Sequence, residues 1–90
     1  KCRGIRLILS DDELKIIANN PEQEEAEETV GVAYKGDSVE IGFNVVYLVD
    51  VLNVLDTDNV QIIVSDPNSS ALLHSSDDSS ATYVVMPMRL

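Results

Sequence analysis

The chain has 90 residues, enough for one domain or part of one, and no hydrophobic run approaches the roughly 18 residues that a membrane-spanning helix needs. Sixteen acidic and six basic residues give a net charge of −10, which argues against a chain that covers nucleic acid phosphates evenly. The single cysteine, Cys2, excludes an internal disulfide and fits a reducing compartment.

The first part of the chain predicts three strands separated by polar turns. Residues 4–9 alternate between apolar and other side chains, and residues 14–18 alternate again after a turn. A third strand is predicted where Val30, Val32 and Tyr34 fall on one face. These segments indicate a β-β-β arrangement with antiparallel neighbours.

The second part predicts a strand, a helix and three further strands. A strand over 39–43 ends at Asn44, a residue type that caps the N-terminus of helices. Alternation returns over 60–64, 71–74 and 82–86. Between them, apolar residues at helical spacing form one stripe: Val45, Leu48, Val49, Leu52 and Leu55. The predicted fold class is therefore α+β, with antiparallel sheets and one helix.

The order of the elements predicts a repeat that is incomplete at its N-terminal side. The second part is a full β-α-β-β-β unit, and the first part is the β-β-β end of the same unit. We therefore expect a C-terminal piece of a longer protein that lacks one strand and one helix. Part of the layer over Ile5, Leu7, Ile16 and Val30 is expected to be missing as a result.

Residues that support catalysis or metal binding are few. Cys2 and His74 are far apart in the sequence, and a lone histidine on a short strand is usually structural. Asp56 and Asp58 resemble the start of a calcium loop, but the glycine and glutamate needed later in such a loop are absent. No metal or cofactor is expected. A hydrolase is the weakest hypothesis, because no carboxylate pair has an apolar setting.

An acidic run precedes the third predicted strand and consists of Glu22, Glu24, Glu25, Glu27 and Glu28. On a strand, Glu24 and Glu28 would share one face and Glu25 and Glu27 the other, so the carboxylates do not converge on one ion. Such a run protects a sheet edge from aggregation through charge repulsion. Alternatively it forms an electrostatic seam with a basic partner. Both interpretations are open from the residues alone.

The last five residues, 86–90, form an apolar tail after the final strand. Pro87 has no N–H and ends the sheet ladder. Met86 and Met88 are unbranched and polarizable, which suits a surface that accommodates varied partners. A frayed last strand is the simpler alternative.

Two stretches are distinctive: Asn-Asn-Pro-Glu-Gln-Glu-Glu-Ala-Glu-Glu at 19–28 and Tyr-Val-Val-Met-Pro-Met-Arg-Leu at 83–90. With 3–7, 40–45 and 50–53, they make the chain resemble the C-terminal domain of the bacterial replicative sliding clamp, the beta subunit of DNA polymerase III. The resemblance spans essentially the whole chain.

The resemblance implies a clamp fold in which residues 1–90 are the third domain without its first strand and helix. It implies a noncatalytic processivity factor, a cytoplasmic and nucleoid-associated homodimeric ring that encircles duplex DNA without sequence specificity. The predicted helix lacks Lys and Arg, so no residue is assigned to DNA contact. The alternative is an acidic β-rich scaffold or adhesion domain without a DNA role.

The resemblance also implies two sites. One is a hydrophobic cleft for short peptides of DNA polymerase, clamp loader subunits and repair proteins. Its residues here would be Asn44, Tyr47, Asn68, Ser70, Val84, Val85, Met86, Pro87, Met88 and Arg89. Asn68 stands where an apolar residue is more familiar, so one subsite would be more polar. The other is a subunit interface formed by the acidic run, which favours the seam interpretation.

Overall fold

The structure is a computed structural model that describes residues 4–19, 22, 24–78 and 80–89. Cys2, Leu90 and parts of the 19–28 stretch lie outside the described residues. The elements, in chain order, are β1 (Gly4–Ser10), β2 (Glu13–Asn19), β3 (Glu25–Gly31), β4 (Val39–Asn44), α1 (Val45–Leu55), β5 (Val60–Ile63), β6 (Ala71–Ser75) and β7 (Tyr83–Val85). The predicted order and the α+β class are confirmed.

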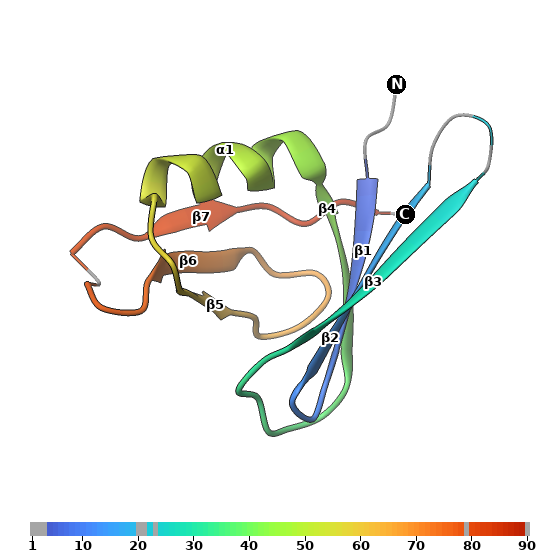
Figure 1. Cartoon of the computed structure of the whole chain (residues 1–90), viewed down its shortest axis with the longest axis horizontal. Helices are drawn as coiled ribbons and strands as arrows, with labels where there is room; N and C mark the ends of the chain where they lie inside the picture. Colours follow the sequence, from blue (N-terminus) through green and yellow to red (C-terminus); the bar gives the residue numbers. More distant parts are fainter. Residues whose placement is uncertain (1–3, 20–21, 23, 79, 90) are drawn as a thin grey trace.

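The strands form two antiparallel sheets. The four-stranded sheet has the order β3-β2-β1-β4, and the three-stranded sheet has the order β5-β6-β7. In Figure 1, α1 runs along the three-stranded sheet, and the four-stranded sheet stands across the end where α1 begins. In the described part of the chain, no helix is long and apolar enough to span a membrane.

The core lies where the two sheets and the helix meet. In β1, Ile5 and Leu7 are buried and face the same side as their register partners Phe43 and Ile41 in β4. The three-stranded sheet and α1 contribute the remaining buried residues, Leu48, Ala71, Leu73 and Val85. The expectation that Ile5 and Leu7 are partly uncovered is wrong, because α1 and the three-stranded sheet already cover this part of the sheet. Ile16 is half-buried, and Val30 is exposed.

The helix begins and ends where the sequence predicts. The Asn44 side-chain oxygen accepts a hydrogen bond from the Val46 N–H at 2.9 Å, which satisfies one of the free donors of the first turn. At the other end Asp56 adopts the left-handed conformation, with φ of 46°, and its N–H donates to the Leu52 carbonyl.

The predicted apolar stripe of the helix is only partly correct. Leu48 is buried, and Val45 and Leu55 pack against the core. Val49 and Leu52 are exposed, and Val51, which the stripe omitted, packs inward instead. The physical reason is that α1 packs mainly against β4, β6 and β7, a footprint narrower than its full apolar surface. Apolar surface is therefore left over on one flank of the helix.

The predicted third strand is displaced toward the acidic run. β3 spans Glu25–Gly31 and pairs with β2, whereas Val32 and Tyr34 lie in the following loop. Asp12 holds this loop. Its N–H donates to the Tyr34 carbonyl at 2.9 Å, its carbonyl accepts from the Val32 N–H at 3.1 Å, and its carboxylate accepts from Lys35 Nζ at 2.7 Å. The β1–β2 turn thus takes backbone groups that a longer β3 would use in the sheet.

Candidate functional site

The C-terminal tail connects the two sheets. After β7, the Met88 N–H donates to the Gly42 carbonyl at 2.8 Å, and these two residues form an isolated antiparallel bridge. Gly42 is also the register partner of Arg6. Arg6, Gly42 and Met88 therefore form a row across β1, β4 and the tail.

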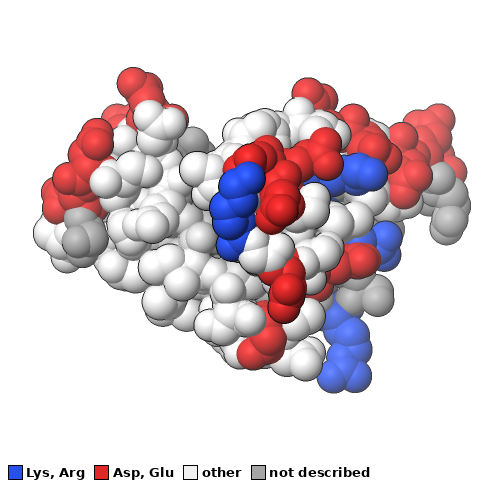
Figure 2. Space-filling model, turned by 90° about the horizontal axis from the view of Figure 1, so that it is seen from below, with Lys and Arg blue, Asp and Glu red and all other residues white. Residues whose placement is uncertain are grey.

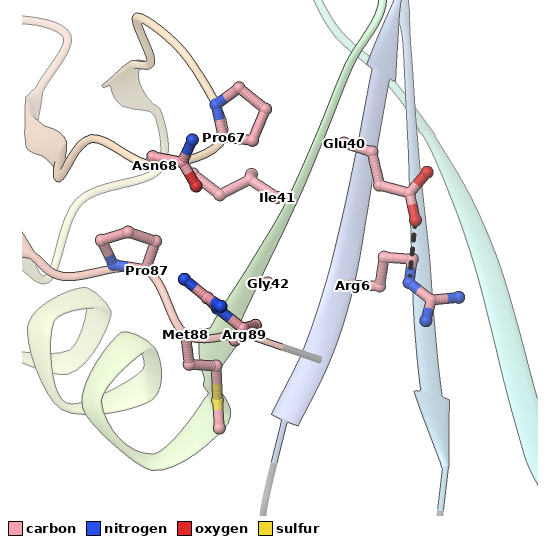
Figure 3. Close-up of a pocket in the computed structure, with 9 residues that line it drawn as sticks. All are labelled: Arg6, Glu40, Ile41, Gly42, Pro67, Asn68, Pro87, Met88 and Arg89. Carbon is pink, nitrogen blue, oxygen red and sulfur yellow. Dashed lines mark ion pairs between the residues drawn. The ribbon is translucent and has the colours of Figure 1, made fainter.

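A pocket of about 640 Å³ opens beside this tail. It is lined by Arg6, Glu40, Ile41, Gly42, Pro67, Asn68, Pro87, Met88 and Arg89. Figure 3 shows Arg6 and Glu40 on one side of the β4 ribbon and Pro67, Asn68 and Pro87 on the other. The pocket thus joins the tail to the outer face of the four-stranded sheet.

The structure brings part of the predicted cleft together around this pocket. Asn68, Pro87, Met88 and Arg89 all line it. Asn68 and Arg89 contribute polar groups to this part of the pocket, and Pro87 and Met88 contribute apolar surface.

Other predicted cleft residues lie beyond the pocket. Met86 and Val84 are 73% and 60% exposed, and Val84 lies beside Leu72 on the same sheet face. Ser70 is half-buried just before β6. Val85 is only 2% exposed and belongs to the core, so it supports this surface from beneath.

The two remaining predicted cleft residues lie at the start of the helix, Asn44 as its N-cap and Tyr47 in its first turn. Tyr47 is 62% exposed on α1. Asn44 has its side-chain oxygen engaged by the Val46 N–H, so its cap function is visible in the structure. Neither residue lines the pocket beside the tail.

Sequence reasoning missed the far wall of the pocket, which is formed by Arg6 and Glu40. Arg6 was visible in the sequence as the residue opposite the apolar face of β1. Its nearness to the tail depends on β1 pairing with β4 and on the bridge from Gly42 to Met88, which join segments far apart in the chain. The side chains meet in an ion pair, with 2.9 Å between Arg6 Nε and Glu40 Oε2.

The turn that carries Asn68 is fixed by a carboxylate. Asp66 accepts hydrogen bonds from the Asn68 N–H and the Ser69 hydroxyl, each at 2.8 Å. The Ser69 hydroxyl, followed by the Asn68 N–H, holds the pKa of Asp66 below its usual value. The ionised side chain therefore shapes one wall of the pocket without lining it.

The acidic run is exposed along its described length. Within β3, Glu25 and Glu27 share the outer face, and Glu28 points to the opposite face beside Ile16. Glu24 precedes the strand, and Glu22 is likewise exposed. Lys15 approaches Glu27 at 3.7 Å, a long contact between exposed groups that contributes little to stability. Among the residues that the structure describes, no three His, Cys, Asp or Glu side chains are grouped to hold a metal ion.

Comparison with known proteins assigns the family. The sequence model of the protein family described as DNA polymerase III beta subunit, C-terminal domain, matches residues 1–89. The chain belongs to this family. It is 64% identical over 90 residues to the beta sliding clamp of Pseudomonas aeruginosa and 56% identical to that of Escherichia coli K12. In both cases the match covers all of this chain and 24% or 25% of the relative.

The solved structures agree. The crystal structure of the DNA polymerase III subunit beta from Pseudomonas aeruginosa aligns with a TM-score of 0.94 and 64% identity, over 100% of this chain and 25% of that one. The clamp-family fold predicted from the resemblance is therefore confirmed. The chain spans about a quarter of the length of the curated relatives it matches. Membership of the beta subunit family does not favour the adhesion or scaffold alternative.

Proposed function

We propose that the protein acts as a DNA sliding clamp, a noncatalytic factor that keeps the replicative polymerase on duplex DNA, and that this chain supplies its peptide-binding surface. The observation that carries the proposal is the C-terminal tail. Met86 stands 73% exposed, and Met88 is fixed to β4 beside an open pocket, in a chain of the beta subunit family. The identity of the relatives as beta sliding clamps supports the same activity.

The tail suits short apolar peptides. Methionine side chains adapt their shape, and Val84 extends the apolar surface along β7. Neighbouring Asn68 and Arg89 supply polar groups that fix the orientation of a bound peptide. The ligands proposed are segments of DNA polymerase, clamp loader subunits and repair proteins, bound at Asn44, Tyr47, Asn68, Ser70 and residues 84–89.

We also propose that the chain is the third clamp domain without its first strand and helix. The apolar surface left over on α1 supports this, because Val49 and Leu52 are exposed next to Val46, and Val54 is exposed farther along the helix. Exposed contiguous apolar side chains on a helix are costly in water unless another element covers them. A preceding strand and helix of the same repeat would cover them.

Ring closure is the proposed role of the acidic run. The carboxylates of Glu22, Glu24, Glu25, Glu27 and Glu28 would face basic residues of a second subunit and close a homodimeric ring around DNA. Encirclement holds DNA topologically, so it needs no sequence-specific contact and no basic helix in this chain. The proposed setting is the bacterial cytoplasm, with the ring at the nucleoid, and no cofactor is required.

Deletion of residues 86–90 from the full-length protein tests the peptide site. We expect the deletion to abolish binding of a fluorescent peptide with an apolar clamp-binding segment, because it removes the adaptable apolar surface. Because the deletion also removes the bridge to Gly42, Met86→Gln is the second variant. Met86 is mostly exposed, so this change weakens binding without loss of fold. Unchanged affinity in both variants, with an unchanged melting midpoint, would contradict the assignment.

A further inference from the structure

The pocket beside the tail continues past the proposed peptide cleft to the outer face of the four-stranded sheet. Its walls come from β1, β4, the Pro67–Asn68 turn and the tail. Arg6 and Glu40, on β1 and β4, lie across the β4 ribbon from Pro67, Asn68 and Pro87 (Figure 3). A peptide that follows the pocket would therefore pass from apolar surface to a charged wall.

The geometry of this charged wall is set by the sheet. Arg6, Gly42 and Met88 lie in one row on three adjacent chain segments, and Gly42 in the middle has no side chain. Adjacent strands are separated by about 4.8 Å, so Arg6 lies about 10 Å from Met88 across β4. An extended peptide covers this distance in about three residues.

The ionisable side chains that line the pocket as a whole carry a net positive charge, against the trend of the chain. Two of the six basic residues of the chain, Arg6 and Arg89, line the pocket together with one carboxylate, Glu40. Among the described residues, Glu40 is the ion-pair partner of Arg6, through Nε, and Arg89 takes part in no ion pair. A guanidinium has five N–H donors, so donors are left for a second acceptor.

We propose that Arg6 extends the peptide cleft across β4 and selects peptides with an acidic side chain about three residues beyond their apolar segment. The Arg6 and Glu40 side chains are 40% and 57% exposed, so their ion pair is weak and the guanidinium is free to share or exchange its partner. A carboxylate of the peptide matches the planar fork of arginine. This inference rests on the proposed peptide-binding function and adds a determinant of specificity to it.

The test is a comparison of two amidated peptides that share one apolar segment and differ only in Glu or Gln at the third residue beyond it. Amidation removes the terminal carboxylate as a competing source of charge. We expect the full-length protein to bind the Glu peptide about two- to fivefold more tightly, with the preference falling as salt is added. Arg6→Gln brings the ratio of the two affinities to about one, because it removes the guanidinium that pairs with the carboxylate of the Glu peptide. Glu40→Gln raises the ratio, because it removes the competing carboxylate.

Lys15→Gln is the matched control. Lys15 lies on the same sheet face as Arg6, its side chain is also 40% exposed and pairs with a glutamate, but it does not line the pocket. The Lys15→Gln substitution removes the same charge as Arg6→Gln and is expected to keep the wild-type ratio of the two peptide affinities. A wild-type ratio of one, or equal losses in the Arg6 and Lys15 variants, would overturn the role of Arg6. If the Gln peptide does not bind the wild-type protein at all, it is the proposed function that fails.

Discussion

β3 and the C-terminal tail are both proposed binding surfaces, but the fold holds them in different ways. β3 pairs with β2 over its full length, and all seven of its residues are exposed. Over its described residues, the tail meets β4 at a single bridge and exposes Met86, and it follows directly on Val85 of β7, which is buried. Backbone pairing alone therefore positions the acidic surface, whereas the apolar surface depends on a side chain anchored in the core.

The two surfaces also differ in the force they can use. Figure 2 shows that charged side chains gather over the half of the molecule formed by the four-stranded sheet, while much of the three-stranded half is uncharged up to the acidic loops at its far end. Charge attraction is screened by salt, and apolar burial is not. Ring closure through β3 is therefore expected to be sensitive to salt, and peptide binding at the tail much less so.

The largest expected effect is on the free energy of unfolding, and it is tested by making a Val→Ala substitution in each of the two regions separately. Val85→Ala removes two buried methyl groups beside Ala71 and lowers the free energy of unfolding by about 2 kcal/mol. Val30→Ala, in β3 at 41% exposure, lowers it by about 0.5 kcal/mol or less. Chemical denaturation midpoints measure both changes. Equal losses would contradict the view that only the strand that carries the tail, β7, is anchored through the core.

Charge reversal of Glu25 and Glu27 to Lys addresses the acidic surface. These residues share the outer face of β3, so both changes act on the same side of the strand. In the full-length protein we expect subunit association to weaken about tenfold to thirtyfold at low salt, with a smaller loss at high salt. Sedimentation equilibrium at several salt concentrations measures this change.

The control for charge reversal carries the same change in net charge elsewhere. Asp58→Lys with Asp77→Lys alters two exposed residues in the loops at the other end of the molecule. This variant is expected to associate like the wild type. If both double variants associate equally well, the acidic run protects a sheet edge and does not close a ring.

The sequence predicts elements well where one local signal decides them. The Asn44 cap and the apolar spacing after it locate α1 correctly, because capping and helical periodicity act within a few residues. The third strand was displaced because the alternation of Val30, Val32 and Tyr34 says nothing about Asp12, 22 residues before Tyr34 in the chain, whose backbone pairs with the loop. Periodicity cannot report competition for hydrogen bonds between distant segments.

The residues of the candidate site also fall into those that local sequence predicts and those that depend on pairing between distant segments. The tail was visible in the sequence because proline and methionine have local chemical meaning. Arg6 and Glu40 were not visible as pocket residues, since only the pairing of β1 with β4 and of Gly42 with Met88 brings them near the tail. The resemblance placed Val85 among the residues of the peptide cleft, and its burial follows from packing under α1 and beside Ala71.

Two substitutions at Asn44 separate its structural role as the cap of α1 from its proposed role in peptide binding. Asn44→Ala removes the cap on the Val46 N–H and costs about 1 kcal/mol in the free energy of unfolding. Asn44→Asp keeps a capping oxygen and is expected to retain most of this stability. Peptide affinity measured in both variants then reports contact with Asn44. If the Asp variant binds peptide like the wild type while the Ala variant loses both properties together, Asn44 serves α1 alone.

The smallest expected effect is that of pH on the turn that holds Asn68. The Ser69 hydroxyl and then the Asn68 N–H lower the pKa of Asp66 from 3.8, so the folded state favours the ionised carboxylate more than the unfolded state does. This contribution to stability is fully present above pH 3.8 and is lost as the pH falls through the lower pKa of the folded state. Protonation therefore loosens the turn only in strong acid.

Ser69→Ala isolates the larger cause of this shift. The variant removes the hydroxyl at 2.8 Å from Asp66 Oδ2 and leaves the Asn68 N–H in place, so the pKa of Asp66 is expected to move back toward 3.8 without reaching it. Carboxyl NMR titration measures the change. Asp78, whose pKa is lowered by Ser80 in the opposite loop, is the internal control and should titrate unchanged. A shift of both carboxyls would mean that the substitution acts through the whole fold, and no shift in either would mean that the Ser69 hydroxyl does not hold the turn that places Asn68 beside the tail.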